Sequence, residues 1–220
     1  MVAECNLNSR IWRSIMSIKW KDYMKELQKT LQSTDYIKPY DIPNIDLYMD
    51  QVTSFMDKHL EASKRYEDDK LLTKTMINNY TKNSLLPPPD KKKYSMDHMY
   101  LLVFIYYLKN FLSISDVKSI ISPMSKMFFG DKGGISLDEI YSQVFQIEEE
   151  MSYGLAKDVM RKFVKSKRTF EEVEGEDERE YLQMFSFIAM LSFDVYLKRN
   201  LIEAIVDDVL GSNDKKKEND

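Results

Sequence analysis

The sequence predicts an all-α protein, and three observations support this fold class. Glycine and proline are scarce, at six each in 220 residues, so tight turns are few. Hydrophobic residues make up 43% of the chain and recur at helical spacing in several stretches. A single cysteine excludes an internal disulfide and a cysteine-rich metal site. A chain of this length can bury a sizeable core without covalent support.

An N-terminal helix followed by an extended link is expected over residues 1–44. Residues 10–31 carry apolar side chains at broadly helical spacing, which predicts an amphipathic helix. Pro39 and Pro43 then hold the backbone extended and end that helix.

A second helix is expected near residues 47–66. Either Asn44 or Asp46 can cap it, because both side chains accept hydrogen bonds from a first helical turn. The polar run 61–70 either extends this helix or forms a link to the next one.

A short helix with two unlike faces comes next. On a helical wheel, one side is expected to dock and holds Met76, Ile77, Tyr80 and Ser84. The other side is expected to read DNA and holds Thr75, Asn78, Asn79 and Lys82. Asparagine pairs with adenine in the major groove, and lysine reaches guanine or phosphate. The alternative interpretation is an ordinary solvent face that is rich in asparagine.

A stiff basic segment, LLPPPDKKKYS, follows that helix. The three prolines at 87–89 restrict the backbone, so Lys91, Lys92 and Lys93 are held out beside the helix. Rigid cations suit a phosphate backbone, and we count Tyr94 with them among the expected DNA contacts. A proline-rich ligand for a partner domain is the alternative.

Two further helices are expected before the first glycine-rich segment. Ser95 can cap a helix whose continuation MYLLVFIYYLKNFL is apolar nearly all round and therefore belongs to the core. The run SISDVKSII predicts a short helix capped by Ser113 or Ser115, which Pro123 helps to end.

The charge distribution sets the middle of the chain apart from its C-terminal part. Residues 70–118 hold eight lysines and three acidic residues, a net charge of +5. Residues 131–220 hold 13 basic and 21 acidic residues, a net charge of −8. This asymmetry is typical of a chain in which one module approaches a polyanion, although lysines that merely solvate a helical surface give the same count.

The C-terminal part is expected to consist of long helices. Three of the six glycines lie in GDKGG, residues 130–134, where we place a domain boundary between residues 45–129 and 135–211. A long helix is expected from Ser136 towards Phe170, and a final helix follows the acidic run 171–180 and ends near Gly211. Residues 212–220 are expected to be a disordered tail.

The final helix contains MFSFIAML, residues 184–191, which is apolar on nearly every side. Such a helix is either shared between two subunits or central in a bundle. We expect a homodimer, in which residues 135–211 dimerise or sense a signal; the alternative is a monomer with a central helix.

The middle segment resembles the winged helix-turn-helix of MerR-type regulators. The resemblance rests on Tyr80, Leu85-Leu86, Tyr94-Ser95, Ser113-Ile114 and Val117-Lys118. It implies that Asn78 takes the place of the recognition-helix arginine and that Lys92 takes the place of the wing arginine. The wing is shortened, Ser84 replaces a glycine, and the expected first helix is displaced to residues 47–60. The fold this implies is a MerR-like head plus a C-terminal long-helix bundle.

The whole chain, including IPNIDLYMDQVTSFM, is also similar to the uncharacterised bacterial DUF1836 family, which implies no activity. The function we expect is that of a sequence-specific transcriptional regulator that binds double-stranded DNA. A protein-interaction adaptor with a degenerate helix-turn-helix is the alternative. An enzyme with an unfamiliar helical site ranks last.

Signatures of other functions are missing from the sequence. His59 and His98 have no histidine or cysteine close to them in sequence, so we expect surface roles for both and no metal site. The segment 130–134 lacks the ending of a phosphate-binding loop. We therefore expect no enzymatic activity and no cofactor, and no effector ligand can be named. The apolar runs are too short for a membrane helix, which together with the lone cysteine predicts a soluble cytoplasmic protein.

Overall fold

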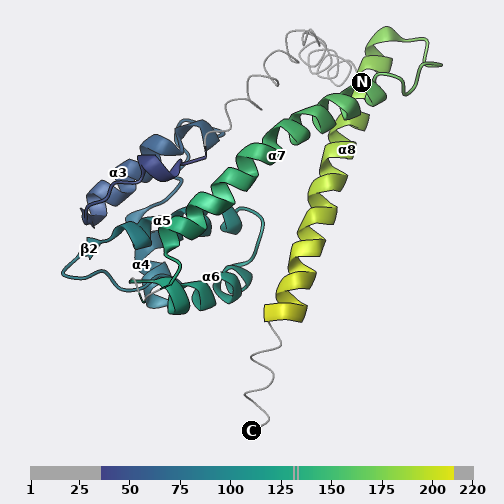
Figure 1. The fold of residues 1–220 in the computed structure, drawn as a ribbon. Helices are drawn as coiled ribbons and strands as arrows, with labels where there is room; N and C mark the ends of the chain where they lie inside the picture. Colours follow the sequence, from purple (N-terminus) through teal and green to yellow (C-terminus); the bar gives the residue numbers. More distant parts are fainter. Residues whose placement is uncertain (1–35, 131, 133, 211–220) are drawn as a thin grey trace. The chain divides into compact units, whose positions relative to one another are not determined.

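A computed structural model describes residues 36–130, 132 and 134–210 (Figure 1). These residues divide into two compact units. The globular unit comprises residues 36–148 and 198–210, and the hairpin unit comprises residues 149–197. The helix expected over residues 10–31 and the tail 212–220 lie outside the described residues.

Helices dominate the described part of the chain, and the two strands are short. The elements in chain order are η1 (Pro39–Asp41), β1 (Leu47–Tyr48), α3 (Met49–His59), η2 (Glu61–Ser63), α4 (Lys74–Lys82), β2 (Lys93–Tyr94), α5 (Met96–Lys109), α6 (Ile114–Phe128), α7 (Leu137–Ser166), α8 (Glu176–Ile205) and the π-helical η3 (Val206–Leu210). The mainly helical prediction is confirmed. No helix in these residues is both long enough and apolar enough to cross a membrane.

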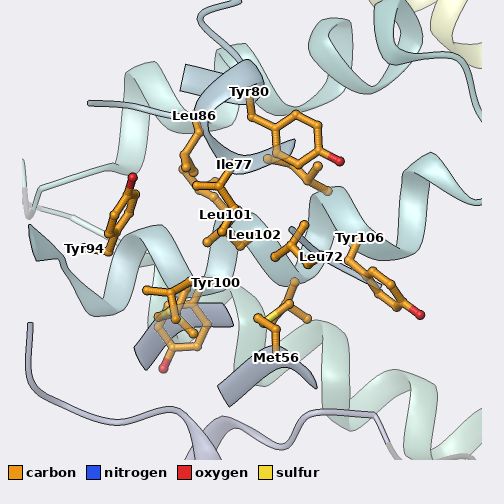
Figure 2. Packing of buried hydrophobic residues seen from close by; sticks show 14 of the residues in the cluster. Met56, Leu72, Ile77, Tyr80, Leu86, Tyr94, Tyr100, Leu101, Leu102 and Tyr106 are labelled. Carbon is orange, nitrogen blue, oxygen red and sulfur yellow. The ribbon is translucent and has the colours of Figure 1, made fainter. Parts of the chain in front are cut away.

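The core of the globular unit is built around α5. This helix is buried nearly all round, as the run MYLLVFIYYL predicts, and Met99, Leu101 and Leu102 are fully enclosed. Side chains from α3, α4 and the segment before α4 pack with it, among them Met56, Leu72 and Ile77 (Figure 2). Helix α6 lies against α5 through Val117 and Ile121.

The core continues past the segment 130–134, where we expected a domain boundary. Leu137 and Tyr141, in the first turns of α7, are buried in the same cluster. The Tyr141 hydroxyl donates to the carbonyl of Ile37, and the Tyr100 hydroxyl of α5 donates to Asp138. The start of α7 thus belongs to the globular unit, which divides from the hairpin unit after residue 148.

The structure corrects two helix boundaries. Helix α3 ends at His59 rather than near residue 66, and the polar run 61–70 forms a link. Helix α6 continues through Pro123 to Phe128, although we expected Pro123 to end it. Pro123 is on the exposed side of the helix, where a backbone carbonyl that loses its N–H partner can be solvated.

Two capping predictions had different outcomes. Helix α3 is capped neither by Asn44 nor by Asp46, because it begins at Met49 and Tyr48 occupies the N-cap position. The Gln51 side chain accepts a hydrogen bond from the Tyr48 N–H at 2.8 Å. Ser113, by contrast, caps α6 and accepts from the Asp116 N–H at 3.1 Å. In α3 the glutamine thus satisfies the N–H of the N-cap residue, whereas the serine of α6 satisfies an N–H inside the first helical turn.

The hairpin unit consists of the second half of α7, a turn and most of α8. The Phe163 ring meets the Phe187 ring at a centroid distance of 5.6 Å, and Lys162 bonds both Asp158 and Asp194. Earlier residues of α7 thus contact later residues of α8, so the two helices run antiparallel. Gln183 fixes the turn by donating to the carbonyls of Lys167 and Thr169.

Candidate nucleic-acid interface

Helix α4 is fixed to the globular unit by one face. The Thr73 hydroxyl caps it by accepting from the Met76 N–H at 3.2 Å. Ile77 and Tyr80 are buried in the core (Figure 2). Met76 is half-buried and packs against the same core. The docking face is therefore the one that the wheel predicted, apart from Ser84, which is exposed.

The opposite face of α4 is open. Its exposed side chains are those expected to read DNA, namely Thr75, Asn78, Asn79 and Lys82. Within the described part of the chain, no hydrogen bond engages the side-chain amide of Asn78 or Asn79; only the Asn79 carbonyl is used, by Asn83. Both amides can therefore offer a donor and an acceptor to an approaching partner.

Helix α4 ends in a left-handed turn at Ser84, whose φ is 55°. The N–H groups of Leu85 and Leu86 both donate to the Tyr80 carbonyl, at 2.8 and 3.2 Å. This closes the helix end and turns both leucines into the core, where each is 1% exposed. Ser84 thus adopts a conformation that normally favours glycine. This turn directs the two residues that follow it, Leu85 and Leu86, into the core.

A wing follows, formed by residues 87–94. The Lys93 N–H donates to the Asp90 carbonyl at 2.8 Å, and the two residues form an antiparallel bridge. Lys91 and Lys92 occupy the corner with φ values of 46° and 67°. Two successive positive φ values across such a hydrogen bond define a type I′ turn, a position that usually holds Asn-Gly.

The wing is anchored by pairing with the chain before α3. Leu47 pairs with Tyr94 and Tyr48 pairs with Lys93 in a two-stranded antiparallel sheet. The Lys93 ammonium lies 5.6 Å from the centre of the exposed Tyr48 ring, a cation–π distance. The lysines at the tip are consequently held by a short sheet rather than by the prolines alone.

Tyr94 does not lie on the open surface with the lysines. Its side chain is 3% exposed and meets the His98 ring edge-on at a centroid distance of 5.3 Å. Since strand residues alternate between faces, Tyr94 points inward where Lys93 points outward. The tyrosine therefore packs beneath the wing and is not part of the exposed candidate interface, contrary to the DNA contact expected from the sequence.

His98 is buried as well, contrary to the surface role expected from the sequence. It is 3% exposed and lies between Tyr94 and Phe129, whose ring centre is 4.7 Å away. Its Nδ1 accepts from the Ser95 N–H at 3.0 Å, which completes the cap of α5. Burial lowers the pKa of His98, so the neutral ring that this bond requires is favoured.

The two helices that precede the wing are tied together at their starts. Helix α3 packs against α4, and the Lys74 ammonium forms an ion pair with Asp50. The other histidine, His59, stacks on Phe55 at the end of α3 at a centroid distance of 4.3 Å. Helix α3, helix α4 and the wing all contact the same core, so their exposed residues have fixed relative positions.

Three structural details of this region were not predicted from the sequence: the Tyr48–Lys93 contact, the positive φ of Ser84 and the burial of His98. Tyr48 escaped notice because its partner Lys93 lies 45 positions away. The positive φ of Ser84 had a signal, since serine stood where the resemblance called for glycine. His98 had one too, because Ser95 followed three residues later by a hydrogen-bonding side chain is a capping pattern.

Comparisons with known proteins bear on the globular unit alone. No curated protein and no solved structure matches the chain. No group of three or more His, Cys, Asp or Glu that could hold a metal ion occurs among the residues described. The segment that carries every residue of the candidate interface, residues 37–144, matches the family described as a domain of unknown function, DUF1836.

Proposed function

We propose that the protein is a DNA-binding transcriptional regulator whose globular unit carries a MerR-like winged helix-turn-helix over residues 45–129. The observation that supports this most is the pairing of two exposed features on one scaffold. One is the polar face of α4, and the other is the lysine corner of the wing. A helix and a wing side by side are what a duplex requires for base and backbone contacts.

Base reading is assigned to α4. The free amides of Asn78 and Asn79 match the donor and acceptor pattern of adenine, and Lys82 one turn later can reach guanine or phosphate. Thr75 begins the same face. The docked side, with Ile77 and Tyr80, has no surface left to offer.

Phosphate binding is assigned to Lys91, Lys92 and Lys93. A non-glycine residue in the left-handed region costs about 1–2 kcal/mol, and two lysines adopt it in succession. Backbone strain of this kind persists where a side chain is needed at that place. A turn that holds two cations outward, where Asn-Gly would fold more easily, favours a role in binding a polyanion.

Two copies of the chain are proposed to join through the hairpin unit. Large apolar side chains of α8 that are more than half exposed support this, and they include Phe185, Ile188, Phe193 and Val195. A two-fold dimer would present two copies of α4 to neighbouring half-sites of one duplex.

The test is a genomic-fragment selection followed by binding measurements. Changing Lys91, Lys92 and Lys93 together to alanine should weaken binding to every sequence and reduce the slope of affinity against salt by about 0.9 for each phosphate that the variant no longer neutralises. Asn78→Ala should relax preference at one position and leave that slope unchanged. A matched control, Lys118→Ala with Lys126→Ala and Lys165→Ala, removes the same charge from exposed sites elsewhere.

The outcomes separate the proposed function from its alternative. Equal losses in the wing variant and the control variant would show that net charge alone drives binding. If the selection enriches no sequence and no binding occurs at low salt, the regulator proposal is wrong. A stoichiometric protein partner that survives nuclease treatment would then favour the adaptor.

A further inference from the structure

A pocket of about 380 Å³ lies between the end of α5 and the link that precedes α4. Its walls are Ser63, Asp69, Lys70 and Leu71 from the link and Tyr106, Tyr107, Lys109 and Asn110 from α5 and its cap. The volume is in the range of small-ligand sites. All of these residues belong to the globular unit, on a different set of side chains from the proposed DNA interface.

Lys109 is the distinctive residue of this pocket. Its ammonium is half-buried, donates to the Leu71 carbonyl at 3.0 Å and lies 5.4 Å from the centre of the Tyr106 ring. No carboxylate of a described residue forms an ion pair with it. Two of the three ammonium protons therefore have no hydrogen-bond acceptor among those residues.

The charged side chains that line the pocket are two lysines and one aspartate, a net charge of +1. Asp69 is the one acidic side chain in the wall, and its Oδ2 already accepts from the N–H groups of Arg65 and Tyr66 at 3.0 Å. Lys70 is exposed at the rim and adds a second cation. Burial lowers the pKa of Lys109, as expected for a cation that lacks a counter-ion.

The carbonyls at the end of α5 do not compete for Lys109. Those of Tyr107 and Leu108 accept from the N–H groups of residues 110, 111 and 112. Figure 2 shows Tyr106 at the edge of the core with its hydroxyl directed away from the packed side chains. The pocket thus offers a partly desolvated cation, a second, exposed cation and aromatic walls.

We propose that this pocket binds a small carboxylate or phosphate anion, with Lys109 as the central ligand and Lys70 at the rim. The anion would accept hydrogen bonds from the two ammonium protons of Lys109 that do not point to the Leu71 carbonyl. Since Lys109 also holds the Leu71 carbonyl, two residues before the Thr73 cap of α4, binding also changes the environment of the link at Leu72 and Thr73. The inference does not depend on the proposed DNA binding.

The experiment follows the Lys109 side chain by NMR in the full-length protein, without DNA. Sodium acetate and sodium phosphate are titrated separately, with sodium chloride at equal ionic strength as the control. Either anion should raise the pKa of the Lys109 ammonium and shift the backbone amides of Leu72 and Thr73. Lys118, which is exposed on α6, should respond equally to all three salts.

The two anions identify the chemistry of the ligand. A response to acetate alone assigns a carboxylate, a response to phosphate alone assigns a phosphate, and a response to both assigns an anion site of broad choice. Lys109→Met keeps the apolar stem against Tyr106 and should weaken anion binding about tenfold or more, the loss expected for a charge-assisted hydrogen bond. Lys118→Met should bind as the wild type does.

A Lys109 signal that responds no more to acetate or phosphate than to chloride overturns the proposal. This result is readable on the wild-type protein, so it stands even if Lys109→Met fails to fold. Failure of the DNA-binding proposal leaves the anion titration unaffected, because no step of it uses DNA.

Discussion

The globular unit and the hairpin unit use their apolar residues in opposite ways. In the globular unit the large side chains of α5, with neighbours from α3, α4, α6 and α7, form one continuous buried cluster. In the hairpin unit the buried residues among those described are Val159, Ser166, Gln183 and Phe187. Large side chains such as Tyr153 and Phe193 stay well exposed there, at 69% and 65%.

Polar contacts also hold the hairpin unit together. Lys162 bridges Asp158 and Asp194 between the two helices, and the buried Gln183 holds the turn. Hydrophobic content alone therefore does not locate a core in this protein. The apolar side chains of α5 are buried in their own unit, whereas many apolar side chains of α8 are exposed to solvent.

The largest expected difference in the free energy of unfolding is between one side-chain truncation in the globular unit and one in the hairpin unit. Leu101→Ala, in the fully buried part of α5, should lower the free energy of unfolding by about 2–5 kcal/mol, because it leaves a cavity. Phe193→Ala, on the exposed side of α8, should change the monomer's stability by no more than about 0.5 kcal/mol. Urea unfolding at low protein concentration measures both.

Phe193→Ala also tests whether two copies of the chain associate when protein concentration is raised. If the α8 surface joins two copies, the unfolding midpoint of the wild type should rise with concentration, and Phe193→Ala should reduce that rise. A wild-type midpoint that is independent of concentration would argue for a monomer. The hairpin unit would then be stable despite its exposed apolar side chains.

The next test concerns the wing, where two lysines adopt unfavourable positive φ values. Replacing Lys91 with Asn and Lys92 with Gly fits the turn to its favoured residues and should stabilise the protein by about 1–2 kcal/mol. The same change should weaken DNA binding. Thermal unfolding and a binding titration on one preparation measure the two effects, and a variant that gains stability without losing affinity would remove the lysine corner from the interface.

A smaller gain is expected at the end of α4. Ser84→Gly relieves the left-handed conformation and should stabilise the protein by about 0.5–1 kcal/mol, after allowance for the greater freedom of glycine in the unfolded chain. Ser54→Gly, at an exposed position inside α3, is the control and should destabilise, because it places glycine in a helix interior. Chemical denaturation of both variants decides whether Ser84 is strained.

The smallest expected effect depends on pH. Because the pKa of folded His98 is lowered, the unfolded chain takes up a proton first as the pH falls below about 6.5, the ordinary histidine value. Stability should therefore be full above that pH and decline below it until the folded pKa is reached. His98→Gln removes this contribution, whereas His59→Gln keeps it. Parallel slopes of stability against pH for wild type and His98→Gln would contradict the assignment.

Helical periodicity was enough to predict most of the fold in the described residues. The burial of α5 on nearly all sides and the buried and exposed faces of α4 could be predicted from the spacing of apolar residues alone. The continuation of α6 through Pro123 could not be predicted from the local sequence, because the helix also buries Val117 and Ile121 in the core. Tertiary burial decided that case against local propensity.

The candidate interface was predictable for α4 and only partly for the wing. The polar residues of α4 share a face through the helix geometry itself, so their exposure was legible in the sequence. The inward direction of Tyr94 and the outward direction of Lys93 depend on strand pairing with residues 47–48, which no local pattern announces. The Lys109 pocket depends on a contact across 38 positions and was equally out of reach.

The globular unit is closed by residues that come after the hairpin. Ile202 packs against its core and η3 lies against α6, although both follow residue 197 in the chain. During synthesis on a ribosome, α6 would thus lack this cover until the last turns of α8 had emerged. Shortened chains that stop at residue 197 should retain α4 and the wing but expose an apolar strip on α6, and would be more readily captured by chaperones than the longer form.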